Sequence, residues 1–418
     1  MNGIELGVAT AATQIEGGRV DSNWQHWADV PGNVADGSTP ERAADHWNRV
    51  DQDLELLLDL NVKHYRMGLE WARIEPEPGV FSGPALDHYA DELTELCASG
   101  IKPLVTLHHF NNPWWFEELG GFENPNAVTI LTRYTRQVVE RLGGLVDEWI
   151  TINEPNVYAT QGWYFGVWPP GKKSLKDTLK VMQTCIEAHV AMYNTIHSIQ
   201  PDAKVGVAHH LRLFRPARKT NPLDWAGARA MAYLFQGALV KAMTLGEIRP
   251  PFKRNGIEPG QYADFHGVNY YTPNIVRGFT EEVAPNVAVN DLGWEIYPAG
   301  IAQICRRLDE IFPAPIYITE NGTADAADAW RSRFLYDHLK ALAESGLPVK
   351  RYYHWCFTDN WEWVEGEEPR FGLVELDYDT QERRVRDSGR FFADMSWKGE
   401  VTEEAYSRWV ANSHYRKN

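Results

Sequence analysis

The chain has 418 residues, a net charge of −16 at neutral pH, and an ordinary globular balance of 44% hydrophobic and 23% charged residues. The excess of negative charge argues against nucleic acid and anionic membrane surfaces as partners. The sequence has no run of 18 apolar residues that could cross a membrane, and its N-terminus lacks the pattern of a signal peptide. We therefore expect a cytoplasmic protein.

Aromatic residues are abundant, with 17 Trp, 18 Tyr and 16 Phe. A well-packed core accounts for this composition, and so does a carbohydrate site, because flat rings pack against the C–H faces of sugars. The four cysteines form no C-x-x-C pair and lie in apolar or helical contexts, so we expect buried thiols in a reducing compartment. They are Cys97, Cys185, Cys305 and Cys356.

Eight apolar segments have the composition of short buried strands. They span residues 4–12, 62–70, 101–109, 146–154, 204–211, 265–272, 315–320 and 349–357. Amphipathic stretches with helical spacing lie between them. These stretches span residues 51–60, 86–99, 126–142, 175–199, 226–244, 298–311 and 330–345.

The alternation of strand and helix predicts an α/β fold, a (β/α)8 TIM barrel with long loops that follow the strands. The sequence has no linker, low-complexity segment or short-period repeat that would divide it. We therefore expect residues 1–418 to form a single domain.

Polar side chains occur where most of the predicted strands end. In a barrel of this kind the carboxyl ends of the strands form the active face. The residues in question are Gln14, Arg66, Glu70, His108, His109, Asn153, Glu154, Asn269, Tyr271, Glu320 and Trp355.

Two glutamates end strands with a similar pattern. Glu154 follows L-V-D-E-W-I-T-I-N, and Glu320 follows P-I-Y-I-T. Two carboxyl groups that flank a bond can hydrolyse a glycoside, one as acid and one as nucleophile. We expect Arg66 and Tyr271 to keep Glu320 ionised, and burial and the charge of Glu320 to raise the pKa of Glu154. With Glu320 as nucleophile and Glu154 as acid and then base, the pair predicts a retaining reaction with the carboxyl groups roughly 5–5.5 Å apart.

Over nearly its whole length the chain resembles the β-glycosidases of glycoside hydrolase family 1. T-I-N-E-P at 151–155 resembles the acid/base motif of that family, and I-T-E-N-G at 318–322 resembles its nucleophile motif. A-T-A-A-T-Q-I-E-G at 9–17, V-N-Y-Y-T at 268–272 and D-N-W-E-W-V-E-G at 359–366 match further motifs. Several motifs in the family's order make the resemblance specific.

The resemblance implies roles for further residues. Gln14, His109, Glu362 and Trp363 would bind the outer sugar hydroxyls, Asn153 the 2-hydroxyl, and Trp355 would lie under the ring. Asn269 and Phe371 are expected to complete the substrate-binding residues.

The third strand departs from the family pattern. It ends in T-L-H-H-F-N-N-P at 106–113, where the family usually has Thr-Leu-Phe/Tyr-His-Trp-Asp-Leu-Pro. The sugar-binding histidine therefore aligns with His109, and Phe110 replaces a tryptophan. We expect Phe110, Trp168 and Trp294 on the aglycone side of the site.

Three alternative functions fit the sequence less well. A 6-phospho-β-glycosidase would have serine in place of Glu362, and Glu367 and Glu368 would repel a phosphate. A barrel that only binds carbohydrate would be expected to have lost Glu154 or Glu320. A metal-dependent hydrolase lacks ligand spacing such as H-x-H or H-E-x-x-H.

The sequence thus predicts a retaining β-glycosidase that releases terminal β-D-glucosyl residues, and also β-D-galactosyl or β-D-fucosyl residues, without a cofactor or metal. The expected partner is a small oligosaccharide or an aryl or alkyl β-glycoside. Transfer to acceptors other than water, and the oligomeric state, are left open.

Overall fold

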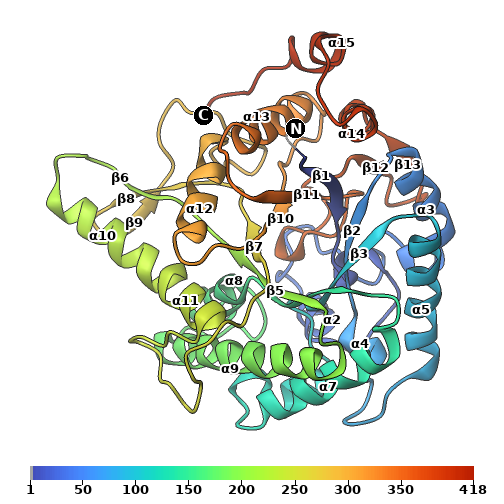
Figure 1. The fold of residues 1–418 in the computed structure, drawn as a ribbon, viewed down its shortest axis with the longest axis vertical. Coiled ribbons are helices and arrows are strands. Elements are labelled where there is room, and N and C mark those ends of the chain that lie inside the picture. The colour runs from blue at the N-terminus through green and yellow to red at the C-terminus, as the bar shows by residue number, and fades with distance from the viewer. Residues whose placement is uncertain (1–2) are drawn as a thin grey trace.

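The computed structural model describes residues 3–418, so the first two residues of the predicted 1–418 domain lie outside the described residues. Eight parallel strands close into a barrel in the order β1-β11-β10-β7-β5-β4-β3-β2, with helices around them (Figure 1). This confirms the predicted (β/α)8 fold. The strands are β1 (Glu5–Ala9), β2 (His64–Gly68), β3 (Lys102–His108), β4 (Glu148–Asn153), β5 (Lys204–His210), β7 (His266–Asn269), β10 (Ile316–Asn321) and β11 (Val349–Trp355).

The longer helices lie outside the barrel (Figure 1). They are α3 (Val50–Asp59), α5 (Gly83–Ala98), α7 (Ala127–Leu142), α9 (Leu175–Ile199), α10 (Pro222–Ala232), α11 (Ala238–Leu245), α12 (Ala299–Asp309), α13 (Arg331–Ala343) and α14 (Asp387–Lys398). Local sequence sets their ends. The Ser82 hydroxyl accepts a hydrogen bond from the backbone N–H of Ala85, and Pro84 occupies the first turn of α5.

The predicted helix 226–244 begins earlier in the structure. The Asn221 side chain accepts a hydrogen bond from the backbone N–H of Leu223, so α10 begins at Pro222. A π-helical turn, η4 (Tyr233–Gly237), then joins α10 to α11.

The loops carry short elements that the sequence did not predict. One small sheet contains β6 (Phe214–Pro216), β8 (Asn274–Arg277) and β9 (Thr280–Glu282), and a second pairs β12 (Val374–Leu376) with β13 (Arg383–Val385). Strands of three or four residues are too short to show a hydrophobic period. The remaining short helices are α1 (Ala12–Ile15), α2 (Asn23–Ala28), η1 (His46–Asn48), α4 (Trp71–Ile74), α6 (Trp114–Glu118), η2 (Gly121–Glu123), α8 (Pro155–Ala159), η3 (Thr160–Phe165), η5 (Trp363–Glu365), α15 (Glu403–Ala405) and η6 (Tyr406–Val410).

Barrel strands are buried on both faces, which is why they read as continuous apolar runs. In β4, Trp149 and Ile152 pack outward with the helices, whereas Ile150 belongs to a separate inner cluster with Leu104 and Ala208. Burying each such aliphatic side chain stabilises the fold by about 1.5–3 kcal/mol. The two clusters hold the strand ends, and the polar residues on them, in place.

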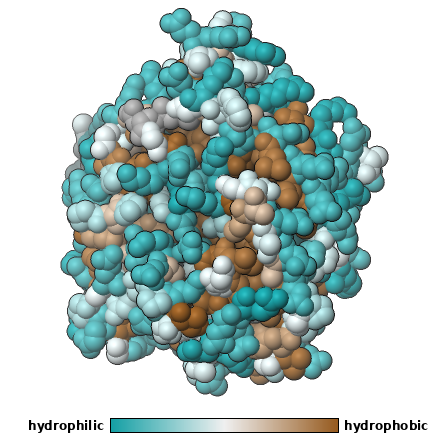
Figure 2. Space-filling view, turned by 45° about the vertical axis from the view of Figure 1, so that its right-hand side comes forward, coloured by the Kyte–Doolittle hydropathy of each residue, from teal (hydrophilic) through white to brown (hydrophobic). Residues whose placement is uncertain are grey.

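The outer surface is mostly hydrophilic, with apolar side chains in separate patches on the face in Figure 2. Within residues 3–418, none of the helices is both long and apolar enough to cross a membrane. The four cysteines are free thiols; three are buried as expected, but Cys97 is exposed, so the prediction was wrong for that residue. Cys97 lies near the C-terminal end of α5 and is not among the residues that this helix buries.

Candidate active site

A pocket of about 130 Å³ opens at the carboxyl ends of the barrel strands. Most of the side chains predicted to form the site line it. They are Gln14, His109, Phe110, Asn153, Glu154, Trp168, Tyr271, Trp294, Glu320, Trp355, Glu362, Trp363 and Phe371. Arg66 and Asn269 are fully buried and hydrogen-bond to the residues that line the pocket. Four further residues line the pocket that the sequence analysis did not place there, namely Val157, Gln161, His210 and Arg212.

Glu154 lies between β4 and α8 in an unusual backbone conformation. Its φ and ψ are 42° and 57°, in the left-handed region, and Pro155 begins α8 directly after it. This conformation costs of order 1–3 kcal/mol for a residue other than glycine, and such costs concentrate at functional sites. The side chain is buried, and its Oε1 accepts hydrogen bonds from His210 Nδ1 at 2.9 Å and Asn269 Nδ2 at 2.8 Å.

Glu320 lies near the end of β10 and is also buried. Arg66 donates a hydrogen bond to its Oε1, and the Tyr271 hydroxyl donates one to its Oε2 at 2.6 Å. Both predicted partners of Glu320 are therefore in contact with it. Gly322 follows in the tight bend beyond β10, where a Cβ atom would lie 1.8 Å from the carbonyl oxygen of Trp355. Only glycine fits this close approach between the ends of β10 and β11.

Buried amides connect the two carboxyl groups. Arg66 donates to Asn153 Oδ1 at 2.7 Å as well as to Glu320, and Asn269 Nδ2 donates to Asn153 Oδ1 at 3.0 Å and to Glu154. The carboxyl groups therefore occupy fixed positions that a single hydrogen-bond network determines.

The pKa values differ from the expectation. Burial raises the pKa of Glu320 to about 7; Arg66 opposes the increase, and the charge of Glu154 adds to it. Burial also favours a higher pKa at Glu154, but His210, Asn269 and Arg66 outweigh it and hold that pKa below its ordinary value. The expectation that Glu154 has the raised pKa and Glu320 the low one is wrong for the free protein. The two donors on Glu154 Oε1 come from other strands, so the motif around Glu154 could not reveal them.

Unpaired buried polar atoms point to a ligand rich in hydroxyl groups. Asn153 Nδ2 donates to His109 Nε2 at 3.0 Å, which places the imidazole proton on Nδ1. That Nδ1 atom and Gln14 Oε1 are buried and have no hydrogen-bond partner among residues 3–418. Because buried polar atoms are almost always paired in native structures, these two atoms are suited to a ligand that both accepts and donates hydrogen bonds.

Glu362 lies beside this pair. Gln14 Nε2 donates to Glu362 Oε2 at 3.2 Å and to the backbone oxygen of Trp361 at 2.9 Å. Burial and the charge of Glu320 raise the pKa of Glu362 to about 8. The raised pKa favours the protonated carboxyl group, which both donates and accepts hydrogen bonds.

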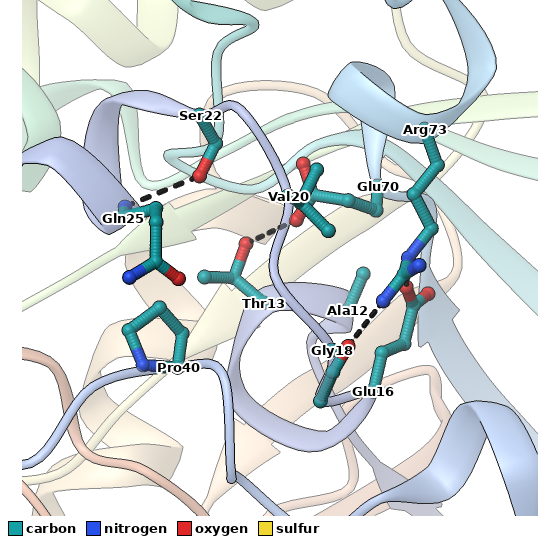
Figure 3. A pocket seen from close by; sticks show the side chains of 11 residues that line it. Ala12, Thr13, Glu16, Gly18, Val20, Ser22, Gln25, Pro40, Glu70 and Arg73 are labelled. Atoms are coloured by element: carbon teal, nitrogen blue, oxygen red, sulfur yellow. Dashed lines mark hydrogen bonds and ion pairs between the residues drawn. The ribbon is translucent and has the colours of Figure 1, made fainter.

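A second buried cluster supports the turn that carries Gln14, α1. Figure 3 shows Thr13 and Glu70 pointing toward one another and Arg73 beside Glu16. Thr13 Oγ1 donates to Glu70 Oε2 at 2.6 Å, and Arg73 Nε donates to Glu16 Oε2 at 2.8 Å. Burial raises the pKa of Glu16 to about 7, with Arg73 opposing the increase. These contacts hold the turn α1 in place. Glu70 therefore supports the turn and does not itself line the pocket.

Aromatic rings form the walls of the pocket. The ring of Trp355 lies 6.0 Å from that of His109, and Phe110 packs edge-on against Trp363 at 5.4 Å. Trp294 lies 6.1 Å from Phe371 on the other side. The walls therefore offer flat apolar faces next to polar atoms, a combination suited to sugar rings.

His210 and Arg212 are the main residues that sequence reasoning missed. His210 is the second residue of a His209-His210 pair, which lacks the H-x-H spacing of a metal site. In residues 3–418, no cluster of three or more His, Cys, Asp or Glu side chains is arranged to hold a metal ion. The signal that could have found His210 is its position at the carboxyl end of β5, the one strand for which no polar end residue had been assigned.

The barrel and its paired carboxyl groups define a class, the glycoside-cleaving barrel enzymes. The family model of glycosyl hydrolase family 1 matches residues 2–400. The chain is 33% identical to β-glucosidase A of Thermotoga maritima, over 94% of this chain and 96% of that protein. It is 32% identical to a 1,4-β-D-glucan glucohydrolase of Thermotoga neapolitana, over 96% and 99% respectively.

Solved structures agree with the sequence relatives. A β-glycosidase from Pyrococcus horikoshii superposes with a TM-score of 0.90 at 33% identity, covering 98% of this chain and 97% of that one. The Thermotoga maritima β-glucosidase in complex with glucoimidazole has a TM-score of 0.90 at 30% identity, covering 96% and 99%. The chain belongs to glycosyl hydrolase family 1. It is a glycoside hydrolase of the type that these β-glucosidases represent.

Proposed function

We propose that the protein hydrolyses terminal non-reducing β-D-glucosyl residues with retention of configuration, and β-D-galactosyl and β-D-fucosyl residues as well. The observation that carries the proposal is the pair of buried carboxyl groups, Glu154 and Glu320, held in one pocket by a shared amide network. The names of the relatives support glucosides as the main substrates.

In the first step a carboxylate oxygen of Glu320 attacks the anomeric carbon, and the bond from that carbon to the aglycone oxygen breaks. Glu154 gives its proton to the leaving oxygen, and a glycosyl ester of Glu320 forms. In the second step water attacks the anomeric carbon and gives a proton to Glu154. The ester bond then breaks, and Glu320 is released as a carboxylate. A carbohydrate hydroxyl in place of water would give transfer instead of hydrolysis.

Proton placement follows from the coupling of the two carboxyl groups. With the pKa of Glu320 at about 7, the pair retains one proton at mildly acidic to neutral pH. Attack requires this proton on Glu154 and the negative charge on Glu320. Arg66 and Tyr271 both donate to Glu320, and their hydrogen bonds stabilise the carboxylate in this form.

The sugar hydroxyls are proposed to pair with Gln14 Oε1, His109 Nδ1 and the carboxyl group of Glu362, with Asn153 near the 2-hydroxyl. Trp355 and Trp363 would lie against the ring, while Phe371 and Asn269 complete this subsite. Phe110, Trp168 and Trp294 are proposed to line the aglycone side.

An unphosphorylated sugar fits better than a sugar 6-phosphate. Glu362 lines the pocket, and Glu367 forms an ion pair with Arg42, so that arginine is not available to a phosphate. We also propose one catalytic domain for the whole chain. A cytoplasmic location stays a prediction from the sequence.

The decisive test combines a substrate panel with a nucleophile variant. The wild-type protein should hydrolyse nitrophenyl β-D-glucoside, β-D-galactoside and β-D-fucoside, cellobiose and lactose, and NMR should show the β anomer as the first product. Glu320→Gly should lose this activity, and azide should restore turnover and give the α-glycosyl azide. Wild-type rates in Glu320→Gly, or an α anomer as first product, would rule out the mechanism.

A further inference from the structure

The hydrogen bonds around His210 fix its protonation state. Arg212 Nε lies 2.8 Å from His210 Nε2, and His210 Nδ1 lies 2.9 Å from Glu154 Oε1. A guanidinium N–H can only donate, so Nε2 must be the unprotonated, accepting nitrogen. The imidazole is then neutral with its proton on Nδ1, and that N–H donates to Glu154.

The surroundings of His210 keep it in this state. Burial lowers the pKa of His210 and the charge of Arg212 lowers it further, against the opposing effect of Glu154. Glu281 of β9 lies 3.7 Å from Arg212, and the Tyr271 ring stacks on the imidazole at 5.9 Å. The Phe235 ring of η4 covers another edge at 6.2 Å. A second imidazole proton would have to point at the N–H of Arg212, so His210 does not store a proton.

The two oxygens of Glu154 therefore differ. Oε1 accepts from both His210 and Asn269, which leaves no room for a proton of its own. Both side-chain donors to Glu154 bond to Oε1, so the lone pairs of Oε2 are the ones available to a proton, and Glu154 lines the pocket. The acidic proton of Glu154 thus belongs on Oε2, the oxygen that does not accept these two hydrogen bonds.

We propose that Arg212 and His210 are positioning residues that hold the catalytic proton of Glu154 on Oε2, with Arg212 acting through the tautomer of His210. This inference rests on the proposed function, in which Glu154 is the acid. Asn156 Nδ2 contributes by donating to the backbone oxygen of His210 at 2.8 Å, which fixes the end of β5.

Without Arg212, the histidine would be free to change its state. Nδ1 could then accept the proton from Glu154 Oε1, or the imidazole could become a cation that pairs with ionised Glu154. In both cases Oε2 loses the proton that the leaving group needs. Substrates with poor leaving groups depend on that proton, whereas activated aryl glycosides hardly need it.

The test is a double-mutant cycle with Arg212→Met, His210→Asn and both together. An asparagine amide nitrogen can take the place of Nδ1 and donate to Oε1, but it has no second tautomer that depends on Arg212. We expect Arg212→Met to lower kcat/KM for phenyl β-glucoside by about 10-fold or more. For 2,4-dinitrophenyl β-glucoside the loss should be only about twofold. In the His210→Asn background, Arg212→Met should have little further effect on either substrate.

Two more readouts separate this role from a structural one. Arg212→Lys keeps a cationic donor and should recover most of the loss. In Arg212→Met the acidic limb of the pH profile for phenyl β-glucoside should move toward the ordinary pKa of histidine, about 6.5. Rates are expressed per active site titrated with a 2-deoxy-2-fluoro glucoside, so that misfolded protein does not count.

Equal losses for both leaving groups, or the same loss in the His210→Asn background, would overturn the proposal, because Arg212 would then act on the fold or on the aglycone directly. Either of these outcomes is compatible with hydrolysis by the wild-type protein, so the proposed function would still stand. A wild-type protein that hydrolyses neither aryl glucoside would instead refute the proposed function, and this inference with it.

Discussion

Arg66 hydrogen-bonds to the carboxylate of Glu320, and its second terminal nitrogen donates to Asn153 at 2.7 Å. The guanidinium is fully buried, and the Thr319 backbone oxygen at 3.1 Å and the Thr106 hydroxyl at 3.2 Å complete its partners. The planar fork of an arginine reaches several acceptors at once, which a lysine cannot do. One residue on β2 therefore positions groups on β4 and β10.

We predict that Arg66→Met lowers kcat/KM for aryl β-glucosides by about 100-fold or more, since the charge opposite Glu320, the proposed nucleophile, is lost. The charge of Arg66 lowers the pKa of Glu320, so its removal should raise that pKa further above 7. The kcat/KM of Arg66→Lys should lie between those of Arg66→Met and the wild-type protein. Arg141→Met, which removes an exposed ion pair with Asp87, is the matched control and should keep normal rates.

Glu154→Ala should separate substrates by their leaving groups. Hydrolysis of phenyl or alkyl β-glucosides should fall by about 10²–10⁴-fold, while 2,4-dinitrophenyl β-glucoside should still glycosylate Glu320 readily. Added azide should speed the second step and give the β-glycosyl azide. If both substrate classes slow equally, Glu154 is not the acid.

The pH profile of kcat/KM should be bell-shaped, with limbs that belong to the coupled pair. The alkaline limb should fall at about pH 7, where the pair loses its last proton. The acidic limb should fall below pH 4.5, because the lower pKa of the pair is depressed. A profile that stays flat from pH 6 to pH 9 would contradict this assignment.

Gly322→Ala should damage stability and activity together. The new Cβ would meet the Trp355 carbonyl oxygen at 1.8 Å and force the ends of β10 and β11 apart. We expect a loss of about 1–3 kcal/mol in the free energy of unfolding and a lower kcat/KM. Gly83→Ala, whose Cβ would meet no atom within 4 Å at the start of α5, is the control for unfolding measurements.

Much of this arrangement could be predicted from the sequence. The eight barrel strands are mostly buried and rich in apolar residues, so their composition predicts them. Glu154 and Glu320 could be recognised because a carboxylate at the end of such a strand is costly unless it has a function. The contacts of Arg66 and Tyr271 with Glu320 agree with the expectation.

The protonation states could not be predicted, and the reason is spatial. The pKa of Glu154 depends on His210 from β5 and Asn269 from β7, and neither contact can be recognised from the sequence around Glu154. Arg212 follows β5 by two residues, in a loop whose short strand β6 has no detectable period. Contacts between residues on different strands depend on how the barrel closes, and the sequence of a single strand does not show them.

Gln14 and Glu362 hydrogen-bond although they lie 348 positions apart in the chain, and β1 closes the barrel against β11. A ribosome must therefore complete almost the entire polypeptide before the sugar pocket can exist. Truncated chains that end between Glu320 and Glu362 would retain both glutamates of the proposed mechanism and yet lack Glu362 of the proposed sugar subsite. We therefore expect glycoside cleavage only from chains that extend past Glu362, because shorter chains lack part of the proposed sugar subsite.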